Sequence, residues 1–326
     1  MHTRILGNTG LEVTEISFGA YAVGGTTYRG GTPTGWTGSN IFESLQLLRK
    51  AWDIGINFFD TADAYGRGKS EVLLGMALHY VKNKVIIASK GGSGLAAPIK
   101  DFSEAHLRGA LDSSLSRLER DYLDLYMLHS PSIKQMDERA FHTMRSLKEE
   151  GRIHSWGVSV NSIPEALHAI DNGAEVLQIV YNMLEPEIGN AIFPIAKQNN
   201  VGIIVREALC SGLLSGKFKK DHVFPREDHR SIKFPASRIN SIVNKLEQMN
   251  FLLEDCTDMA EAALRFVLSE PAVSTVIVGC KSIAQLDTNI NADGKRLSRN
   301  QLERIQEIAA QDNEAKRLDN VYGFIS

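Results

Sequence analysis

Short apolar segments alternate with helical patterns along nearly the whole chain. Eight segments are rich in β-branched and other apolar residues and lack the polar–apolar alternation of a half-exposed strand. Because each is followed by a stretch with helical periodicity, the pattern predicts parallel strands that are buried on both faces. The predicted strands are Ile16–Phe18, Ile56–Phe59, Val85–Ser89, Leu123–Leu128, Ile153–Val158, Val176–Val180, Val201–Val205 and Thr275–Val278.

Eight such repeats in 326 residues predict an α/β fold of the (β/α)8 TIM-barrel type. The turn Gly7-Asn8-Thr9-Gly10, which lies between two apolar segments, predicts an N-terminal β-hairpin. A long insertion, Glu207–Thr257, follows the seventh strand. An open doubly wound sheet is the alternative, but the Gly-x-Gly-x-x-Gly turn usual after its first strand is missing. Since no linker or composition shift interrupts the chain, we expect residues 1–326 to form one domain.

Composition limits the classes of function. The net charge is −3 and no long run of Lys and Arg occurs, which argues against a nucleic-acid partner. No stretch reaches the ~18 apolar residues of a membrane span, and the first residues lack the apolar core of a signal peptide, so we expect a cytoplasmic protein. The three cysteines are too scattered for a disulfide framework or a metal site. Free thiols and no bound metal are expected.

Polar side chains follow the predicted strands at the end where a parallel barrel carries its active site. Asp60 and Tyr65 follow the second strand, Lys90 the third and His129 the fourth. Each residue alone has a plain structural explanation, such as a capping aspartate, a packing histidine or a lysine in a solvated loop. These four residue types at three consecutive strand ends are a more specific set, and we expect them to share one site.

This set of side chains predicts proton transfer. A free tyrosine has a pKa near ~10 and exchanges protons poorly at neutral pH. A cationic Lys90 nearby is expected to lower the pKa of Tyr65, while Asp60 holds the lysine in place and His129 orients Tyr65 or a substrate oxygen. Tyr65 would then give a proton to a developing alkoxide, which suits carbonyl reduction. No side chain supplies a hydride, so a nicotinamide cofactor is required.

The sequence resembles the aldo-keto reductases, specifically bacterial-type NADP(H)-dependent members, over nearly its whole length. The matching segments occur in family order: Leu6–Val13, Asn57–Gly66, Ala88–Gly91, Leu128–Pro131, Gly157–Ser159, Gln178 with Tyr181-Asn182, Gly212–Lys217 and Val276–Gly279. The resemblance implies an NADPH-dependent reductase of aldehydes or ketones. It also implies that Tyr65 is the general acid/base, that Lys90 and His129 tune and orient it, and that Asp60 pairs with Lys90.

The resemblance further implies that NADPH lies across the rim of the barrel, with NADH also possible. Ser159 and Gln178 are then expected at the nicotinamide, the backbone of Leu209, Gly212 and Leu213 at the pyrophosphate, and Gly279, Lys281, Gln285 and Asn289 at the adenosine end. Lys281 is the candidate for the ribose 2′-phosphate. Arg206 stands where many members stack an aromatic residue on the nicotinamide. Its charge would disfavour the oxidised cofactor; alternatively it could pair with Glu207 or hold a substrate carboxylate.

Several questions stay open at the level of sequence. The Gly-rich loop from Gly24 to Gly38 carries Tyr28 and Trp36, and forms either a wall over a polar or sugar-like carbonyl substrate or a plain surface loop. The segment Phe224–Arg230 resembles one that the family folds near the cofactor or substrate. A cofactor-binding regulatory subunit and a Schiff-base lyase using Lys90 are the alternative functions. The oligomeric state is not predicted, and the tail Asp312–Ser326 could cover the rim or reach a neighbouring molecule.

Overall fold

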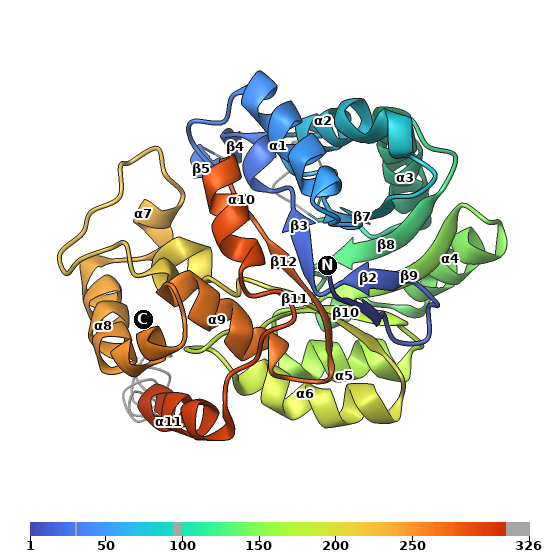
Figure 1. Cartoon of the computed structure of the whole chain (residues 1–326). Coiled ribbons are helices and arrows are strands. Elements are labelled where there is room, and N and C mark those ends of the chain that lie inside the picture. Colours follow the sequence, from blue (N-terminus) through green and yellow to red (C-terminus); the bar gives the residue numbers. More distant parts are fainter. Residues whose placement is uncertain (30, 94–99, 311–326) are drawn as a thin grey trace.

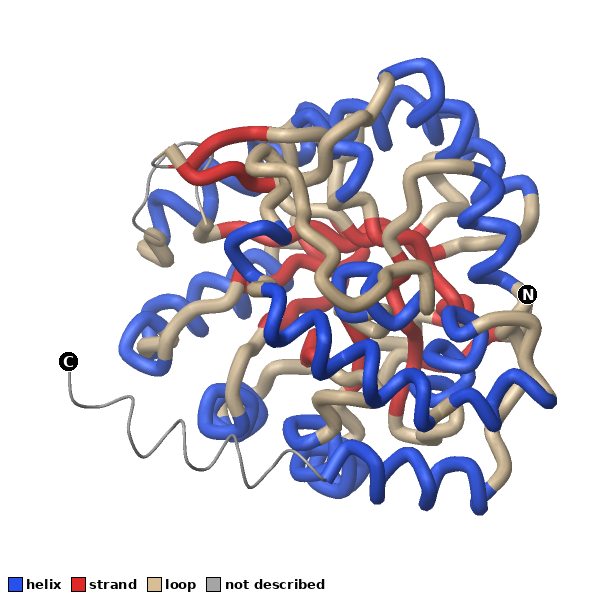
Figure 2. Tube along the Cα trace, turned by 90° about the vertical axis from the view of Figure 1, so that its left-hand side faces the viewer, coloured by secondary structure: helices blue, strands red, loops and turns tan. Residues whose placement is uncertain are grey.

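The structure is a computed structural model that describes residues 1–29, 31–93 and 100–310, so the tail Asp312–Ser326 lies outside the described residues. Eight parallel strands close into a barrel in the spatial order β3, β6, β7, β8, β9, β10, β11 and β12, and helices surround it (Figures 1 and 2). The strands are β3 (Ile16–Gly19), β6 (Phe58–Asp60), β7 (Ile86–Gly91), β8 (Leu123–His129), β9 (Ile153–Ser159), β10 (Val176–Val180), β11 (Gly202–Arg206) and β12 (Val273–Val278). The predicted barrel is confirmed.

The helices begin where polar side chains cap them. Asn40, Ser103, Asp137, Ser162, Asp258 and Ser282 each accept a hydrogen bond from a backbone N–H of the first helical turn. The helices around the barrel are α1 (Ile41–Asp53), α2 (Lys69–Leu78), α3 (Glu104–Leu118), α4 (Glu138–Glu149), α5 (Ile163–Asp171), α6 (Glu187–Gln198), α9 (Met259–Leu268), α10 (Ile283–Ile290) and α11 (Arg299–Ala310). Their apolar faces pack on the barrel, because a strand buried on both faces needs a helix outside it.

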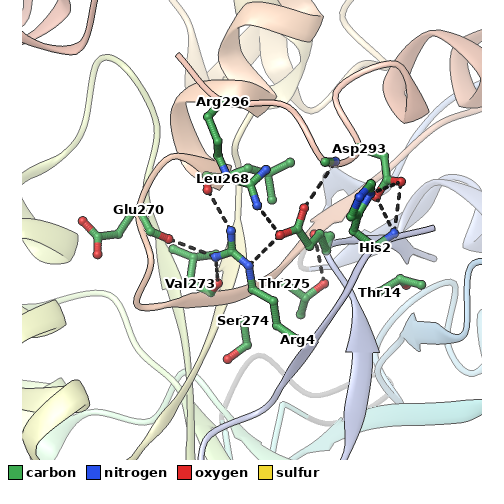
Figure 3. A network of polar contacts seen from close by, with 12 residues as sticks. His2, Arg4, Thr14, Leu268, Glu270, Val273, Ser274, Thr275, Asp293 and Arg296 are labelled. Atoms are coloured by element: carbon green, nitrogen blue, oxygen red, sulfur yellow. Dashed lines mark hydrogen bonds and ion pairs between the residues drawn. The ribbon is translucent and has the colours of Figure 1, made fainter. Parts of the chain in front are cut away.

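The N-terminal hairpin is also confirmed, and it is tied to the amino end of the barrel. Its strands are β1 (Thr3–Ile5) and β2 (Glu12–Thr14). Arg4 donates to the backbone carbonyls of Leu268, Glu270 and Val273, and its Nε lies 2.7 Å from the Glu15 carboxylate (Figure 3). Arg296 binds the same carboxylate. Since these contacts occupy the amino end, the opposite end is left to form the functional site.

The Gly-rich loop is more regular than expected. It contains a short 3-10 turn, η1 (Ala22–Gly24), and an antiparallel hairpin made of β4 (Thr27–Arg29) and β5 (Thr32–Thr34). The backbone N–H of Gly35 donates to the Tyr21 hydroxyl at 2.6 Å. Gly35 has a φ of 80°, and a Cβ there would lie 2.0 Å from the Gly25 carbonyl oxygen, so this close approach requires glycine. The Gly-rich loop therefore contains regular secondary structure.

The insertion after β11 is confirmed and lies beside α9 (Figure 1). It consists of η4 (Cys210–Ser215), α7 (Arg230–Lys233), α8 (Ala236–Gln248) and η5 (Asn250–Glu254). Within the described part of the chain, no helix combines the length and the apolar character that a membrane crossing needs.

Candidate active site

A cleft of about 710 Å³ opens at the carboxyl ends of the strands, a volume typical of ligand sites. It brings together nearly all of the predicted site residues. Its lining includes Asp60, Tyr65, His129, Ser159, Gln178, Arg206, Leu209, Gly212, Gly279, Lys281, Gln285 and Asn289, together with Tyr28 and Trp36. Lys90 is fully buried and reaches the cleft through Asp60 and Tyr65. Leu213 is the exception, because its side chain is buried in the hydrophobic core.

A buried ion pair stands at the floor of this cleft. The Lys90 ammonium lies 2.7 Å from Asp60 Oδ1, 2.8 Å from the Thr61 carbonyl oxygen and 3.3 Å from the Tyr65 hydroxyl. These three acceptors match the three N–H groups of an ammonium, so the buried lysine is fully hydrogen-bonded. Gln178 donates to the other carboxylate oxygen of Asp60 at 2.8 Å. Strand ends β6, β7 and β10 thus hold one polar network, and Gln178 belongs to it.

The electrostatics of Lys90 and Tyr65 differ in one respect from the sequence-based expectation. Burial lowers the pKa of Lys90, but the Asp60 charge and the hydrogen bonds with Asp60 and Tyr65 more than offset it, and the pKa is raised. A lysine held as an ammonium is a poor nucleophile, which argues against a Schiff-base lyase. Burial also raises the pKa of Tyr65, and the Lys90 cation compensates only in part. The expected lowering of the Tyr65 pKa is wrong in direction: the phenol stays protonated and is suited to donate.

His129 faces Tyr65 from the end of β8. The centroids of the two rings are 5.8 Å apart and their planes meet at 80°. The ring of Tyr21 also packs against Tyr65, with 4.8 Å between the centroids. The phenol therefore contacts two rings, with its hydroxyl against Lys90. Tyr21 was not among the site residues predicted from the sequence.

Arg206 projects from the end of β11 and is held in place by the segment that follows β9. Its Nη2 donates to the Val160 carbonyl oxygen at 3.1 Å and to Asn161 Oδ1 at 2.7 Å. Glu207 is engaged elsewhere, with Lys233 at 3.2 Å and the Ser211 hydroxyl at 3.0 Å. The sequence left open that Arg206 pairs with Glu207. In the described part of the structure these two residues form no ion pair.

The far end of the cleft is cationic. Arg230 packs its guanidinium on Trp36, with 4.4 Å to the ring centroid, and the Lys281 ammonium lies 5.4 Å from the same centroid. Burial and then the neighbouring Arg230 charge lower the pKa of Lys281. His229 lies against Trp36 as well, and its Nδ1 is 2.7 Å from the Gly35 carbonyl oxygen. The segment Phe224–Arg230 thus reaches the cleft, as the sequence suggested.

The side chains present fit a nicotinamide dinucleotide. The Tyr65 phenol stands at the floor. Lys281, Arg230 and Lys233 also line the cleft and could bind an anionic phosphate, with Arg230 paired to Asp228 at 2.6 Å and Lys233 to Glu207 at 3.2 Å. Lys281 directly precedes Ser282, the cap of α10, so the N-terminus of that helix adds its positive dipole. The residues that sequence reasoning missed, above all Arg230 and Lys233, come from the insertion. The only sequence signal for Arg230 was the resemblance of the segment Phe224–Arg230, and Lys233, which lies beyond that segment, had none.

Asp63 has an unexpected environment. Asp63 lies in a turn, yet the residue is only 2% exposed. Its Oδ1 has no hydrogen-bond partner among the described residues. Burial, followed by the nearby Glu71 carboxylate, raises the pKa of Asp63 to about 7. Asp63 is therefore a buried acid that takes up a proton close to neutral pH.

We expect Asp63→Asn to stabilise the protein more strongly at pH 8 than at pH 5. Between about pH 4 and pH 7 the folded chain holds a proton that an unfolded aspartate has released, so stability falls as the pH rises through this window. The amide resembles the protonated acid and removes a penalty of roughly 4 kcal/mol at pH 8 and of roughly 1–2 kcal/mol at pH 5. Urea unfolding from pH 5 to pH 8 measures the effect. The exposed Asp121→Asn is the control, and an unchanged pH slope in Asp63→Asn would contradict the assignment.

Comparison with known proteins agrees with this site. Residues 15–310 match the aldo/keto reductase family. The aldo-keto reductase YhdN of Bacillus subtilis (strain 168) is 30% identical over 292 residues, which cover 86% of each protein. A probable voltage-gated potassium channel subunit beta of Arabidopsis thaliana is 27% identical over 312 residues, covering 90% of this chain and 91% of that protein. The solved structure of the glycerol dehydrogenase AKR11B4 from Gluconobacter oxydans superposes with a TM-score of 0.81 at 28% identity, covering 95% of each chain.

The fold and the site together define an oxidoreductase built on a (β/α)8 barrel. The chain belongs to the aldo/keto reductase family. It is an NAD(P)H-dependent oxidoreductase that acts on carbonyl or alcohol groups.

Proposed function

We propose that this protein is an NADPH-dependent reductase of aldehydes or ketones in which Tyr65 is the proton donor. The observation that carries the proposal is the position of the Tyr65 hydroxyl, 3.3 Å from a buried ammonium that is itself paired with Asp60 at 2.7 Å. A phenol in this place donates its proton while the lysine stabilises the phenolate that forms. A cytoplasmic location and the absence of a nucleic-acid partner remain predictions from composition.

Each member of the site has a distinct part in this proposal. Tyr65 and His129 hydrogen-bond the substrate carbonyl oxygen and orient it. The nicotinamide cofactor supplies the hydride to the carbonyl carbon. Tyr65 then gives its proton to the oxygen, and Lys90 holds the resulting phenolate until solvent reprotonates it. Asp60 keeps Lys90 charged and in position, so it acts through the lysine and not on the substrate.

The cofactor is proposed to be NADPH, held at the far end of the cleft. Ser159, Gln178 and Arg206 stand near the phenol, whereas Leu209, Gly212, Leu213, Gly279, Lys281, Gln285 and Asn289 stand along the rest of its path. Leu213 would contribute only its backbone, since its side chain is buried in the core. Lys281 is the proposed partner of the 2′-phosphate, and Arg230 lies on the same indole ring.

We expect Lys281→Ala to weaken NADPH binding about 10- to 100-fold, the value of one or two hydrogen bonds to a charged group, and to change NADH binding little. Fluorescence titration of both cofactors gives the two dissociation constants. Lys220→Ala serves as the control, because Lys220 pairs with Glu247 on the surface. Equal losses of affinity for NADPH and NADH would show that Lys281 does not bind the 2′-phosphate.

The substrate is proposed to be a polar or sugar-like carbonyl compound. The lining of the cleft includes Tyr28 and Trp36 together with Arg67, Lys100 and His229, so it offers both aromatic rings and hydrogen-bond donors. Such a mixture suits a small molecule with several hydroxyl groups. A turnover screen of sugar aldehydes, keto-sugars and aromatic aldehydes tests this class, and a preference for the aromatic aldehydes would contradict it.

Binding and turnover together test the proposed function. NADPH is expected to quench the tryptophan fluorescence of the protein, and its absorbance at 340 nm is expected to fall when a substrate of the right class is added. The similarity to a potassium channel subunit beta raises the second candidate, a cofactor-binding regulatory subunit. Stable NADPH binding with no turnover across the whole panel would favour that candidate over the reductase.

A further inference from the structure

We propose that Arg206 makes the site discriminate between the two redox states of its cofactor, so that oxidised nicotinamide binds more weakly than reduced nicotinamide and is released readily. The inference rests on the proposed function, because it requires the nicotinamide to lie at the strand ends beside Tyr65. It assigns Arg206 a part in the catalytic cycle: limiting inhibition by the product cofactor.

Arg206 is fixed in the cleft by groups outside its own strand. It pairs in register with Val180 of β10, two residues beyond Gln178, so it stands beside the strand that binds Asp60. Its guanidinium donates to the Val160 carbonyl oxygen and to Asn161 Oδ1, which directly follow Ser159. Two hydrogen bonds from the same nitrogen hold the planar head against this wall. Its position is therefore set before any ligand binds.

The guanidinium of Arg206 forms no direct ion pair within the described residues, although its charge, after that of Lys233, helps to lower the pKa of the neighbouring Glu207 carboxyl. No carboxylate in residues 1–29, 31–93 or 100–310 forms an ion pair with it, and Glu207 pairs with Lys233 instead. Its Nε is buried and has no hydrogen-bond partner among these same residues. The charge also reaches the floor of the cleft, where it lowers the pKa values of Asp60 and Tyr65 against the larger effect of burial. The positive charge of Arg206 therefore acts on the floor of the cleft, where the proposed reaction occurs.

The chemistry of the reaction places the nicotinamide within reach of this charge. The substrate oxygen must lie about 3 Å from the Tyr65 hydroxyl, and the hydride donor within about 3.5 Å of the carbonyl carbon. Carbonyl, NADPH and one proton become alcohol and NADP+: a C–H bond of the cofactor breaks, its electron pair forms the new C–H bond, and Tyr65 supplies the proton. The ring is neutral before this step and cationic after it. Arg206 therefore repels the product form specifically.

This repulsion has opposite consequences for two steps of the cycle. Hydride transfer is slowed, because positive charge develops near the guanidinium. Release of the oxidised cofactor is accelerated, and oxidation of alcohols is disfavoured because NADP+ binds weakly. A purely positioning role, in which Arg206 only holds Val160 and Asn161, predicts neither asymmetry.

The test compares neutral and charge-conserving replacements in the full-length protein. In the wild type we expect the Kd for NADP+ to exceed the Kd for NADPH. In both Arg206→Gln and Arg206→Met, NADP+ should bind at least tenfold more tightly relative to NADPH, which corresponds to about 1.4 kcal/mol. Arg206→Lys should keep most of the wild-type ratio. Arg299→Gln controls for the loss of a positive charge, since that side chain is 93% exposed.

Kinetics provide a second and independent readout. In the neutral variants, single-turnover hydride transfer should be faster, while inhibition by added NADP+ should be stronger. Equal weakening of both cofactor forms in all three Arg206 variants, or an unchanged Kd ratio, would overturn the inference and leave the reductase proposal intact. Failure of the wild type to bind either cofactor form would instead overturn the proposed function. A denaturation midpoint measured for each variant separates these results from loss of folding.

Discussion

Tyr65→Phe is expected to lower kcat by about 10²- to 10⁴-fold, the usual contribution of a positioned general acid. The substitution removes only the hydroxyl, which is 3.3 Å from the Lys90 ammonium, and leaves the ring in contact with Tyr21 and His129. The Kd for NADPH should therefore stay within about twofold of the wild-type value. A change of that size corresponds to a difference in binding free energy smaller than RT, which is ~0.6 kcal/mol. Steady-state kinetics and a fluorescence titration measure the two quantities.

Two further tyrosines make this experiment decisive. Tyr21 packs against Tyr65 in the cleft, but its hydroxyl accepts a hydrogen bond from the backbone N–H of Gly35, whereas the Tyr65 hydroxyl lies against the Lys90 ammonium. Tyr21→Phe should therefore retain turnover. Tyr122→Phe, at an exposed position outside the cleft, is the unaffected control. Full activity in Tyr65→Phe would show that Tyr65 is not the proton donor. Loss of activity in Tyr21→Phe alone would indicate that Tyr21 is the donor instead.

Lys90→Met is expected to produce the largest loss of stability. It leaves the Asp60 carboxylate, which is 1% exposed, without its counter-ion inside the barrel. Removing one partner of a buried ion pair typically costs about 3–5 kcal/mol, because the remaining charge stays buried and uncompensated. Turnover should be lost as well, since the phenolate of Tyr65 loses its stabilising cation. Urea unfolding at pH 7 measures the change in free energy.

A double variant separates the lost pair from lost packing. Asp60→Asn combined with Lys90→Met leaves no buried charge, so the double variant should be more stable than Lys90→Met alone. Lys220→Met, which breaks the exposed pair with Glu247, should change stability by less than about 1 kcal/mol. If the two single losses simply added in the double variant, Asp60 and Lys90 would not be coupled as a pair.

The barrel could be predicted from the sequence because its determinants are local. Strands such as Val176–Val180 are largely apolar, and several helices begin at a capping residue such as Ser103 or Asp137. In a parallel barrel these short-range patterns also determine which ends of the strands meet. For this reason Asp60, Tyr65, Lys90 and His129 could be placed at one rim without any structure.

The pKa values of the site residues depend on which groups lie close together in space. The sequence did not predict them correctly. The Tyr65 pKa was expected to be lowered by Lys90, yet burial has the larger effect. The local sequence around Asp63 indicates only a turn. The packing around Asp63 makes it a buried acid with a pKa of about 7. Desolvation depends on everything that surrounds a group, which no local pattern reports.

By itself, the sequence determined the barrel, its hairpin and insertion, and the four polar residues at three consecutive strand ends. The tertiary structure alone decided what each polar group touches: that Gln178 binds Asp60, that Arg206 is held by Asn161 and not by Glu207, and that Arg230 meets Trp36 over the cleft. Periodicity and capping act over a few residues and can be read along the chain. Ion pairs, ring contacts and burial join segments far apart in the sequence, such as Glu15 with Arg296 and Trp36 with Arg230, so they exist only once the barrel has closed.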